Sequence, residues 1–178
     1  MKSGWAVLIL IVLVISGRAC AQKPPRQEPE QTHFSAEDES VKNPIAIPDD
    51  VLALLRQDKM VRSSLEYEGI PPEKLPLSWF SASAIHLSGP GKPDLIVAAE
   101  GPLMGANVEN FWVFRHTDHG YDLVLNAPAH DLIVVRTVWN KLREIEVLGA
   151  TAASVHTVRL RFDGRRYVLY RDKWEDIR

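Results

Sequence analysis

The chain has 178 residues, of which 25% are charged, and a formal net charge of −2. This mild acidity argues against a nucleic-acid-binding protein, which needs a stripe of Lys and Arg to displace counterions from phosphate. The sequence contains one cysteine, Cys20, so it excludes an intramolecular disulfide, and the fold must be stabilised by core burial.

Residues 1–21 have the composition of an export signal. Lys2 gives a positive start, Trp5–Ile15 is an apolar run, and small residues surround Cys20 at the expected cleavage position. The apolar run is about eleven residues, shorter than the roughly twenty that span a bilayer, so we expect cleavage and no stable membrane span. The protein is then periplasmic or secreted, and its net charge changes from −2 to −4 because the signal carries two basic residues and no acidic one.

Cys20 offers the alternative of a lipoprotein, because a cysteine that follows an apolar run can carry lipid. The residue three places earlier is Gly17 instead of the usual large aliphatic residue, and Arg18 also fits a lipidation motif poorly. We therefore expect Cys20 to be removed with the signal, which leaves a chain without a thiol. Lipidation of Cys20 is the less favoured alternative.

Residues 22–43 are rich in Pro, Glu, Gln, Lys and Ser and contain few aliphatic side chains. Such a composition cannot bury enough apolar area to offset the entropy of ordering the chain. We therefore predict a disordered linker over residues 22–43, followed by a single globular domain over residues 44–178.

The globular part begins with a predicted helical segment. Pro48–Asp50 is typical of a helix start, because an acidic side chain can cap free backbone N–H groups. The segment is expected to break near Asp58 and to end before Gly69. Its apolar residues at helical spacing are Val51, Leu54, Leu55, Val61 and Leu65. We expect this apolar face to pack on a sheet.

From about Ser78 onward the apolar period changes from that of a helix to that of a strand. Short segments rich in β-branched and aromatic residues alternate with Gly, Pro, Asn and Asp, which predicts eight strands. These strands are Trp79–Leu87, Asp94–Ala99, Asn110–Arg115, Tyr121–Leu125, Leu132–Thr137, Arg143–Leu148, Thr157–Phe162 and Tyr167–Tyr170.

The eight strands form two similar units of four. The matching pairs, each separated by the same offset, are Arg115 with Arg161, Tyr121 with Tyr167 and Leu123 with Leu169. Four-stranded repeats of this length are typical of propeller blades, but two blades do not close a ring. The predicted fold is mainly β (α+β), with two four-stranded antiparallel meanders that form an eight-stranded sandwich, a barrel or a partial propeller. The helical segment packs on it.

The register of the sixth and seventh predicted strands follows from their charges. In one antiparallel alignment Glu144 lies opposite Arg161, and Glu146 lies opposite Arg159. One face is then charge-paired and the other apolar, whereas a slip by one residue would bury four charges. We therefore interpret the two arginines as structural. In the first unit, Phe111–Phe114 has no polar side and is predicted to be a core strand covered on both faces, with an aromatic binding face as the alternative.

Another pattern consists of Pro93–Val97, Phe111–Arg115 and Gly120-Tyr121, followed by Arg161–Gly164 and Tyr167. It resembles exported bacterial proteins of unknown function that are distantly similar to FG-GAP or VCBS repeats. The resemblance covers about residues 78–170, and it implies a β-repeat architecture without implying an activity. Calcium-binding members of those families carry an Asp-x-Asp-x-Asp-Gly loop, which is missing from this sequence, so the resemblance implies no metal site.

Candidate chemistry is sparse. His116, Asp118 and His119 could together hold zinc, but the equivalent connection in the second unit, Asp163-Gly164, is typical of a hairpin turn, so we predict a turn and no metal.

A hydrolase needs a nucleophile, a base and an orienting acid. Ser154 with His156, or His130 with Asp131, supplies part of such a set, but no Gly-x-Ser-x-Gly, His-Glu-x-x-His or glycine-rich phosphate loop occurs. We predict no enzyme, no catalytic residue and no cofactor. The alternative is a periplasmic hydrolase or metal-dependent enzyme that uses loop histidines, namely His116, His119, His130 or His156.

The connection Gly101–Glu109 is about four residues longer than its counterpart Gly149–His156, and long loops on a rigid sheet tend to carry binding sites. The leading hypothesis is an exported, non-catalytic binding protein for another protein or a glycan. A structural subunit that forms homo-oligomers through unpaired sheet edges is a further alternative. The predicted contact residues are Met104, Gly105, Asn107, Trp139 and Trp174.

Overall fold

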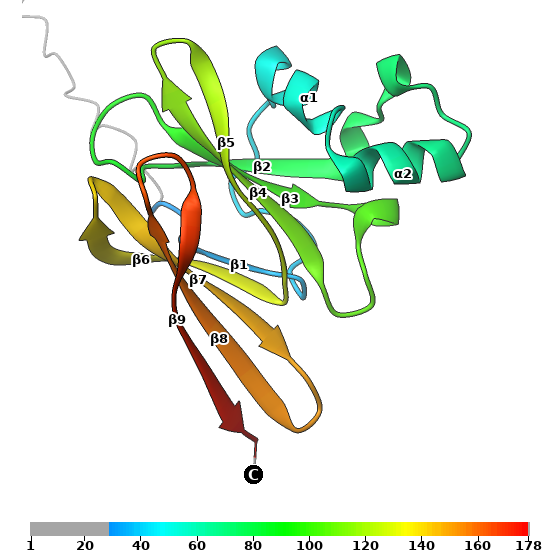
Figure 1. The fold of residues 1–178 in the computed structure, drawn as a ribbon. Helices are drawn as coiled ribbons and strands as arrows, with labels where there is room; N and C mark the ends of the chain where they lie inside the picture. Colours follow the sequence, from blue (N-terminus) through cyan, green and yellow to red (C-terminus); the bar gives the residue numbers. More distant parts are fainter. Residues whose placement is uncertain (1–28, 178) are drawn as a thin grey trace, which may run out of the picture.

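The computed structural model describes residues 29–177, so the predicted signal with Cys20 and the first part of the predicted linker, residues 22–28, lie outside the described residues. Within this part of the chain the fold has two antiparallel sheets, one of four strands and one of five (Figure 1). The strands are β1 (His33–Ser35), β2 (Phe80–Ile85), β3 (Asp94–Ala99), β4 (Glu109–Thr117), β5 (Gly120–Ala129), β6 (Asp131–Trp139), β7 (Leu142–Ala150), β8 (Ser154–Phe162) and β9 (Tyr167–Asp176).

The strand order confirms the predicted fold class. Strands β2, β3, β4 and β5 form one sheet in chain order, and β6, β7, β8 and β9 form the other, with β1 added beside β6. Each predicted four-stranded unit is therefore a meander with its own sheet. The two sheets share an apolar core, so the arrangement is a sandwich and not a closed barrel.

Strand β4 confirms the prediction that Phe111–Phe114 is covered on both faces. Phe111 and Val113 point into the core between the sheets. Trp112 and Phe114 point to the opposite face and pack beneath the helices. The four-stranded sheet is thus the middle layer of the molecule.

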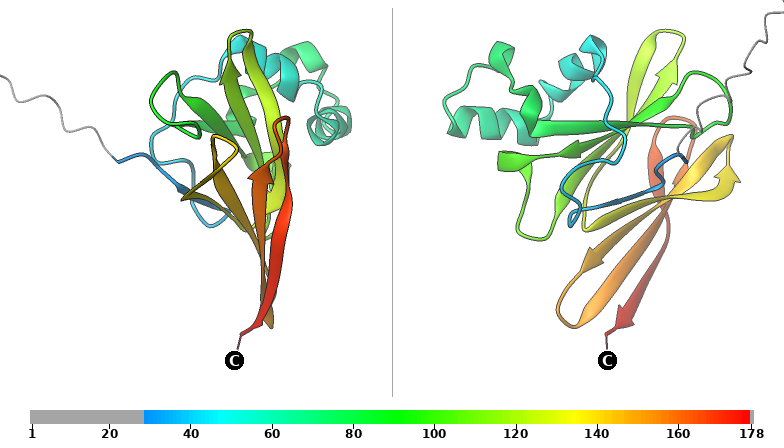
Figure 2. Two further views of the ribbon diagram at one scale, coloured as in Figure 1. Left: turned by 60° about the vertical axis from the view of Figure 1, so that its left-hand side comes forward. Right: turned by 180° about the vertical axis from the view of Figure 1, so that it is seen from behind.

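The outer layer on this sheet is helical, as predicted (Figure 2). The helices α1 (Asp49–Leu55) and α2 (Lys59–Tyr67) are separated at Asp58, whose side chain accepts hydrogen bonds from the N–H groups of Met60 and Val61. Short 3-10 turns follow at η1 (Pro72–Lys74), η2 (Leu77–Trp79) and η3 (Gly101–Leu103). No helix in the described part of the chain is long and apolar enough to cross a membrane.

The start of α1 differs from the prediction in one detail. Pro48 occupies the N-cap position and provides no capping side chain. The Asp50 carboxylate accepts a hydrogen bond from a free N–H of the first turn, that of Val51 at 3.0 Å, and its other oxygen accepts from the N–H of Tyr121 at 3.2 Å, which ties α1 to the first residues of β5. At the end of α2, Gly69 has a φ of +65°, which confirms that the helix stops before a residue that tolerates left-handed backbone.

The predicted register of β7 and β8 is confirmed. Ile145 lies opposite Leu160, Glu146 opposite Arg159, and Val147 opposite Val158. The apolar members of this set face the core between the sheets, and the charged members face outward.

The N-terminal segment differs from the predicted linker over residues 29–43. Strand β1 pairs with β6, and Phe34 and Val41 are buried in the core between the sheets. Farther on, Pro44 forms a bridge with Ser83 and the N–H of Ile45 donates to the carbonyl of Ala82 at 2.9 Å. The segment therefore crosses from one sheet to the other. Average composition did not reveal this, because only two apolar side chains anchor the segment.

Candidate binding surface

The four histidines of the enzyme alternative lie apart. His116 near the end of β4 and His119 in the turn that follows belong to one hairpin, whereas His130 connects β5 to β6 and His156 is on β8. Thr117 pairs with Gly120, which confirms the predicted tight turn. In the described part of the chain no group of three or more His, Cys, Asp or Glu side chains is arranged to hold a metal ion.

The candidate Ser154 and His156 pair is not assembled as a nucleophile and base. The hydroxyl of Ser154 contacts the hydroxyl of Thr151 at 3.1 Å. The ring of His156 instead stacks on Trp174, with centroids 4.0 Å apart. These contacts are typical of structural side chains on a hairpin.

The second candidate pair, His130 with Asp131, is in contact. Nδ1 of His130 lies 3.0 Å from one oxygen of Asp131, and Nε2 of His33 lies 3.1 Å from the other. Burial pushes the pKa of Asp131 upward, but hydrogen bonds from Ser35, His130 and His33 outweigh it and hold the pKa below its usual value. Because His33 is in β1 and Asp131 begins β6, this cluster fastens the N-terminal segment to the sheet.

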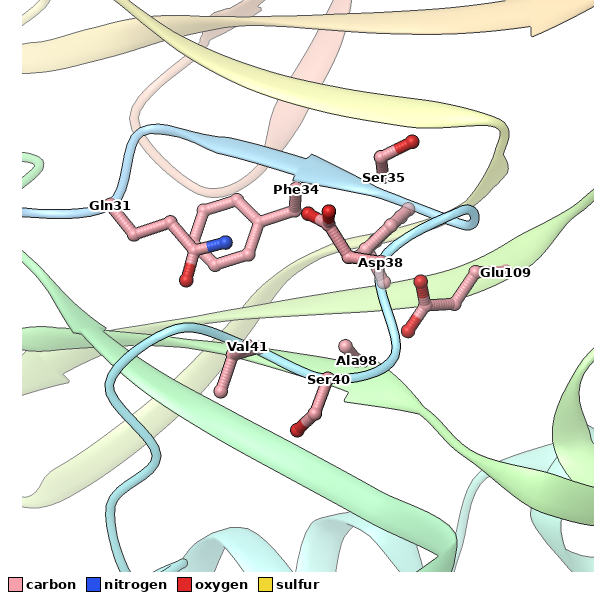
Figure 3. A pocket seen from close by; sticks show the side chains of 9 residues that line it. Gln31, Phe34, Ser35, Asp38, Ser40, Val41, Ala98 and Glu109 are labelled. Atoms are coloured by element: carbon pink, nitrogen blue, oxygen red, sulfur yellow. The ribbon is translucent and has the colours of Figure 1, made fainter.

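A small cavity beneath the same segment contains a perturbed carboxyl group (Figure 3). Glu109 is buried below Asp38 and Ser40, and burial, together with the negative charges of Glu100 and Asp38, raises its pKa to about 8. The cavity has a volume of about 10 Å³, close to the space that one water molecule needs. It is therefore too small for a substrate, and Glu109 is better explained as a buried acid that stays protonated at neutral pH.

Replacement of Glu109 by Gln should stabilise the protein at pH 8 by about 2 kcal/mol, a value reduced from the full pKa shift because the residue is not completely removed from solvent. Because the pKa of Glu109 is higher in the folded state, the group makes its full contribution to stability when the pH is below its unfolded pKa of about 4.5. This contribution is lost as the pH rises towards the folded pKa of about 8. Urea unfolding of both proteins at pH 4 and pH 8 checks this expectation. Equal stabilities at pH 8 would contradict it.

The predicted contact residues do not form one surface. Met104, Gly105 and Asn107 follow η3 on the four-stranded sheet, where the neighbouring Leu103 is buried beneath the helices. Trp139 and Trp174 are on the five-stranded sheet. They belong to different ends of it, because Trp139 pairs with Leu142 and Trp174 pairs with His156.

The structure instead places Trp139 in a second group, on the outer side of the five-stranded sheet. We call this group the arginine–aromatic face, and it consists of Trp139, Arg159, Arg161, Tyr170 and Arg171 on strands β6, β8 and β9. The guanidinium carbon of Arg161 lies 4.5 Å from the ring centroid of Trp139 and 3.2 Å from that of Tyr170. Arg161 is therefore held between two aromatic rings.

A buried carboxylate fixes the arginines of this face. Glu144 is 1% exposed, and its two oxygens accept from Nε of Arg159 at 2.6 Å and from Nε of Arg161 at 2.5 Å. Nη1 of Arg159 also donates to Glu146 at 2.7 Å. Burial acts to raise the pKa of Glu144, but the hydrogen bonds from the arginines prevail and lower it. The guanidinium groups are thus held in place by carboxylates of the same sheet.

The two rings of the face remain accessible. Trp139 is 51% exposed and Tyr170 is 47% exposed. The helices lie on the other sheet, and no described element covers this face (Figure 2). Sequence reasoning identified Trp139 but missed Tyr170, although the outward-facing arginines of β8 were a signal for both. Tyr170 sits where the β8–β9 register shifts, so its neighbours could not be assigned by simple alternation.

Comparison with known proteins adds no relative: no protein-family model, curated protein sequence or solved structure matches the chain. The arginine–aromatic face is therefore interpreted from its geometry alone.

Proposed function

We propose that the protein is an exported, non-catalytic binding protein that engages a partner protein through the arginine–aromatic face. The observation that supports this most is the uncovered pair of rings around Arg161, which is itself fixed by Glu144. Trp, Tyr and Arg are the residues that contribute most to protein–protein binding. Export rests on the composition of residues 1–21.

The shape of the face favours a protein over a small molecule. Small ligands are bound in concave pockets that bury most of their surface, whereas Trp139 and Tyr170 stand on the outer side of a sheet. The charges of Arg159 and Arg161 are already paired. Rigid aromatic and arginine side chains then offer contact area at low entropic cost, which suits a broad protein surface.

A photo-crosslinking amino acid at Tyr170, in intact cells that produce the protein, tests this proposal. A matched probe replaces Tyr67, which is exposed at the end of α2 on the helical side. We expect a polypeptide adduct from position 170 that position 67 does not give, with adducts between copies of the chain recognised by their mass. Trp139→Ala should reduce this adduct by about tenfold, because Trp truncation at a binding centre typically costs at least that much.

Three outcomes would contradict the proposal. The same adducts could form from both positions, Trp139→Ala could leave the adduct unchanged, or the adduct could be a glycan instead of a polypeptide. A glycan adduct would support the other ligand class expected from the sequence. The resemblance to FG-GAP and VCBS repeats is compatible with either ligand and stays a prediction.

A further inference from the structure

The sandwich has two long edges, and the N-terminal segment forms backbone hydrogen bonds along part of one of them. On that edge β1 extends the five-stranded sheet beside β6, and Pro44 and Ile45 bond to β2 of the other sheet. One extended stretch of chain thereby bonds to the first residues of β6 and to the middle of β2, and so covers part of the edge of each sheet (Figure 1). Coverage of this kind is a usual protection of sheet edges against association.

On the opposite edge the N–H of Tyr121 in β5 donates to Asp50 of α1, but no described segment pairs with the outer side of β9. There β5 and β9 are the last strands of their sheets, and each pairs on one side only. A groove of about 490 Å³ runs between them, lined by Leu123 and Leu125 from β5 and by Val168 and Leu169 from β9. Leu123 and Leu169 are both exposed. A ten-residue edge strand with exposed apolar side chains is a template for pairing with another strand.

The charges along β9 indicate which strand pairs with it. Arg165 and Arg166 lead into β9, and neither side chain forms an ion pair within the described residues. Glu175 and Asp176 end the strand; among the described residues Glu175 forms an ion pair with Lys173, and Asp176 forms none. The strand therefore has a basic beginning and an acidic end. Exposed apolar residues also occur at both ends of β9: Leu169 lies near its basic beginning and Trp174 near its acidic end.

We propose that β9 pairs antiparallel with β9 of a second copy of this chain. In a two-fold dimer of this kind the acidic end of each strand lies beside the basic beginning of the other, so one surface is complementary to itself. The two five-stranded sheets then join into one sheet of ten strands. Trp174, near the end of β9 in each copy, then helps to cover the exposed Leu169 of the other copy. This proposal does not depend on the arginine–aromatic face binding a partner, because it concerns the edge of the sheet and not its outer side.

Charge reversal at the two ends of β9 tests the pairing. The first variant carries Arg165→Glu and Arg166→Glu, and the second carries Glu175→Arg and Asp176→Arg. Sedimentation equilibrium of the purified protein should show a dimer, and each variant should raise its dissociation constant at least about tenfold. An equimolar mixture of the two variants should dimerise again, because the basic ends of one then meet the acidic ends of the other.

A control variant, Lys59→Glu with Arg62→Glu, reverses two exposed charges on α2 and should dimerise as the unmodified protein does. All variants change exposed side chains, and circular dichroism verifies that each is folded. The pairing is overturned if the unmodified protein is a monomer up to about 1 mM. It is also overturned if a β9 variant dimerises like the control, or if the mixture does not recover.

Discussion

Replacement of Glu144 by Ala should lower the free energy of unfolding at pH 7 by about 3 kcal/mol, measured by urea denaturation. The carboxylate is buried and holds both Arg159 and Arg161. Among the described residues its removal leaves Arg161 without an ion-pair partner and leaves Arg159 with Glu146 alone. The folded pKa of Glu144 is lowered, so its contribution is present above the unfolded value of about 4.5 and is lost as the pH falls through the folded pKa. The difference from the unmodified protein should therefore shrink in acid.

Glu146 provides the matched control for this change. It is the same residue type on the same face, but its side chain is 24% exposed and it contacts Arg159 alone. Glu146→Ala should cost less than about 1 kcal/mol, as partly exposed ion pairs do. Equal losses for the two variants, or a loss at Glu144 that does not change between pH 7 and pH 3, would show that the buried clamp is not the source of the stability.

The comparison of Glu144 with Glu146 also shows what the sequence can predict. Alternating charged and apolar residues, together with the pairing of opposite charges, predicted the β7–β8 register, because a slip by one residue would place charges in the core. The same pattern does not distinguish the two glutamates. Glu144 is buried because Arg159 and Arg161 both fold over it, which depends on side-chain positions that a pairing pattern does not contain.

The layers of the fold were predictable for a similar reason. Continuous apolar residues in Phe111–Phe114 required cover on both faces, and the structure supplies the second sheet on one side and the helices on the other. The predicted contact residues lie apart in the structure, because loop length indicates where a site could be but not which loops are neighbours. Trp139 and Tyr170 both contact Arg161, although they lie on strands that are distant in sequence.

The N-terminal segment shows where composition is a poor guide. Residues 29–43 have the average composition of a linker, yet Phe34 is 2% exposed in the core between the sheets. Two backbone bonds hold the segment around it, from the N–H of Ala36 to the carbonyl of His130 and from the N–H of Val134 to the carbonyl of Thr32. A single aromatic anchor with edge-strand bonds can order a polar segment, because those bonds replace water at an existing sheet edge.

A substitution in this polar segment should therefore have a large effect on stability. Phe34→Ala should lower the free energy of unfolding by about 3 kcal/mol, because it removes a buried ring and leaves a cavity between the sheets. Hydrogen exchange at the Val134 amide should also accelerate, since its acceptor Thr32 is held in place by the same segment. Phe34→Leu, which keeps most of the apolar volume, should cost roughly half as much.

The two measurements together separate an anchored segment from a linker. A disordered linker would make Phe34→Ala nearly neutral, within about 0.5 kcal/mol, as is usual for exposed positions. It would also leave the Val134 amide exchanging rapidly in the unmodified protein. Slow exchange at Val134 that is lost in Phe34→Ala, with the amides of β8 still protected, would show that the ring fastens this edge of the sandwich while the five-stranded sheet persists without it.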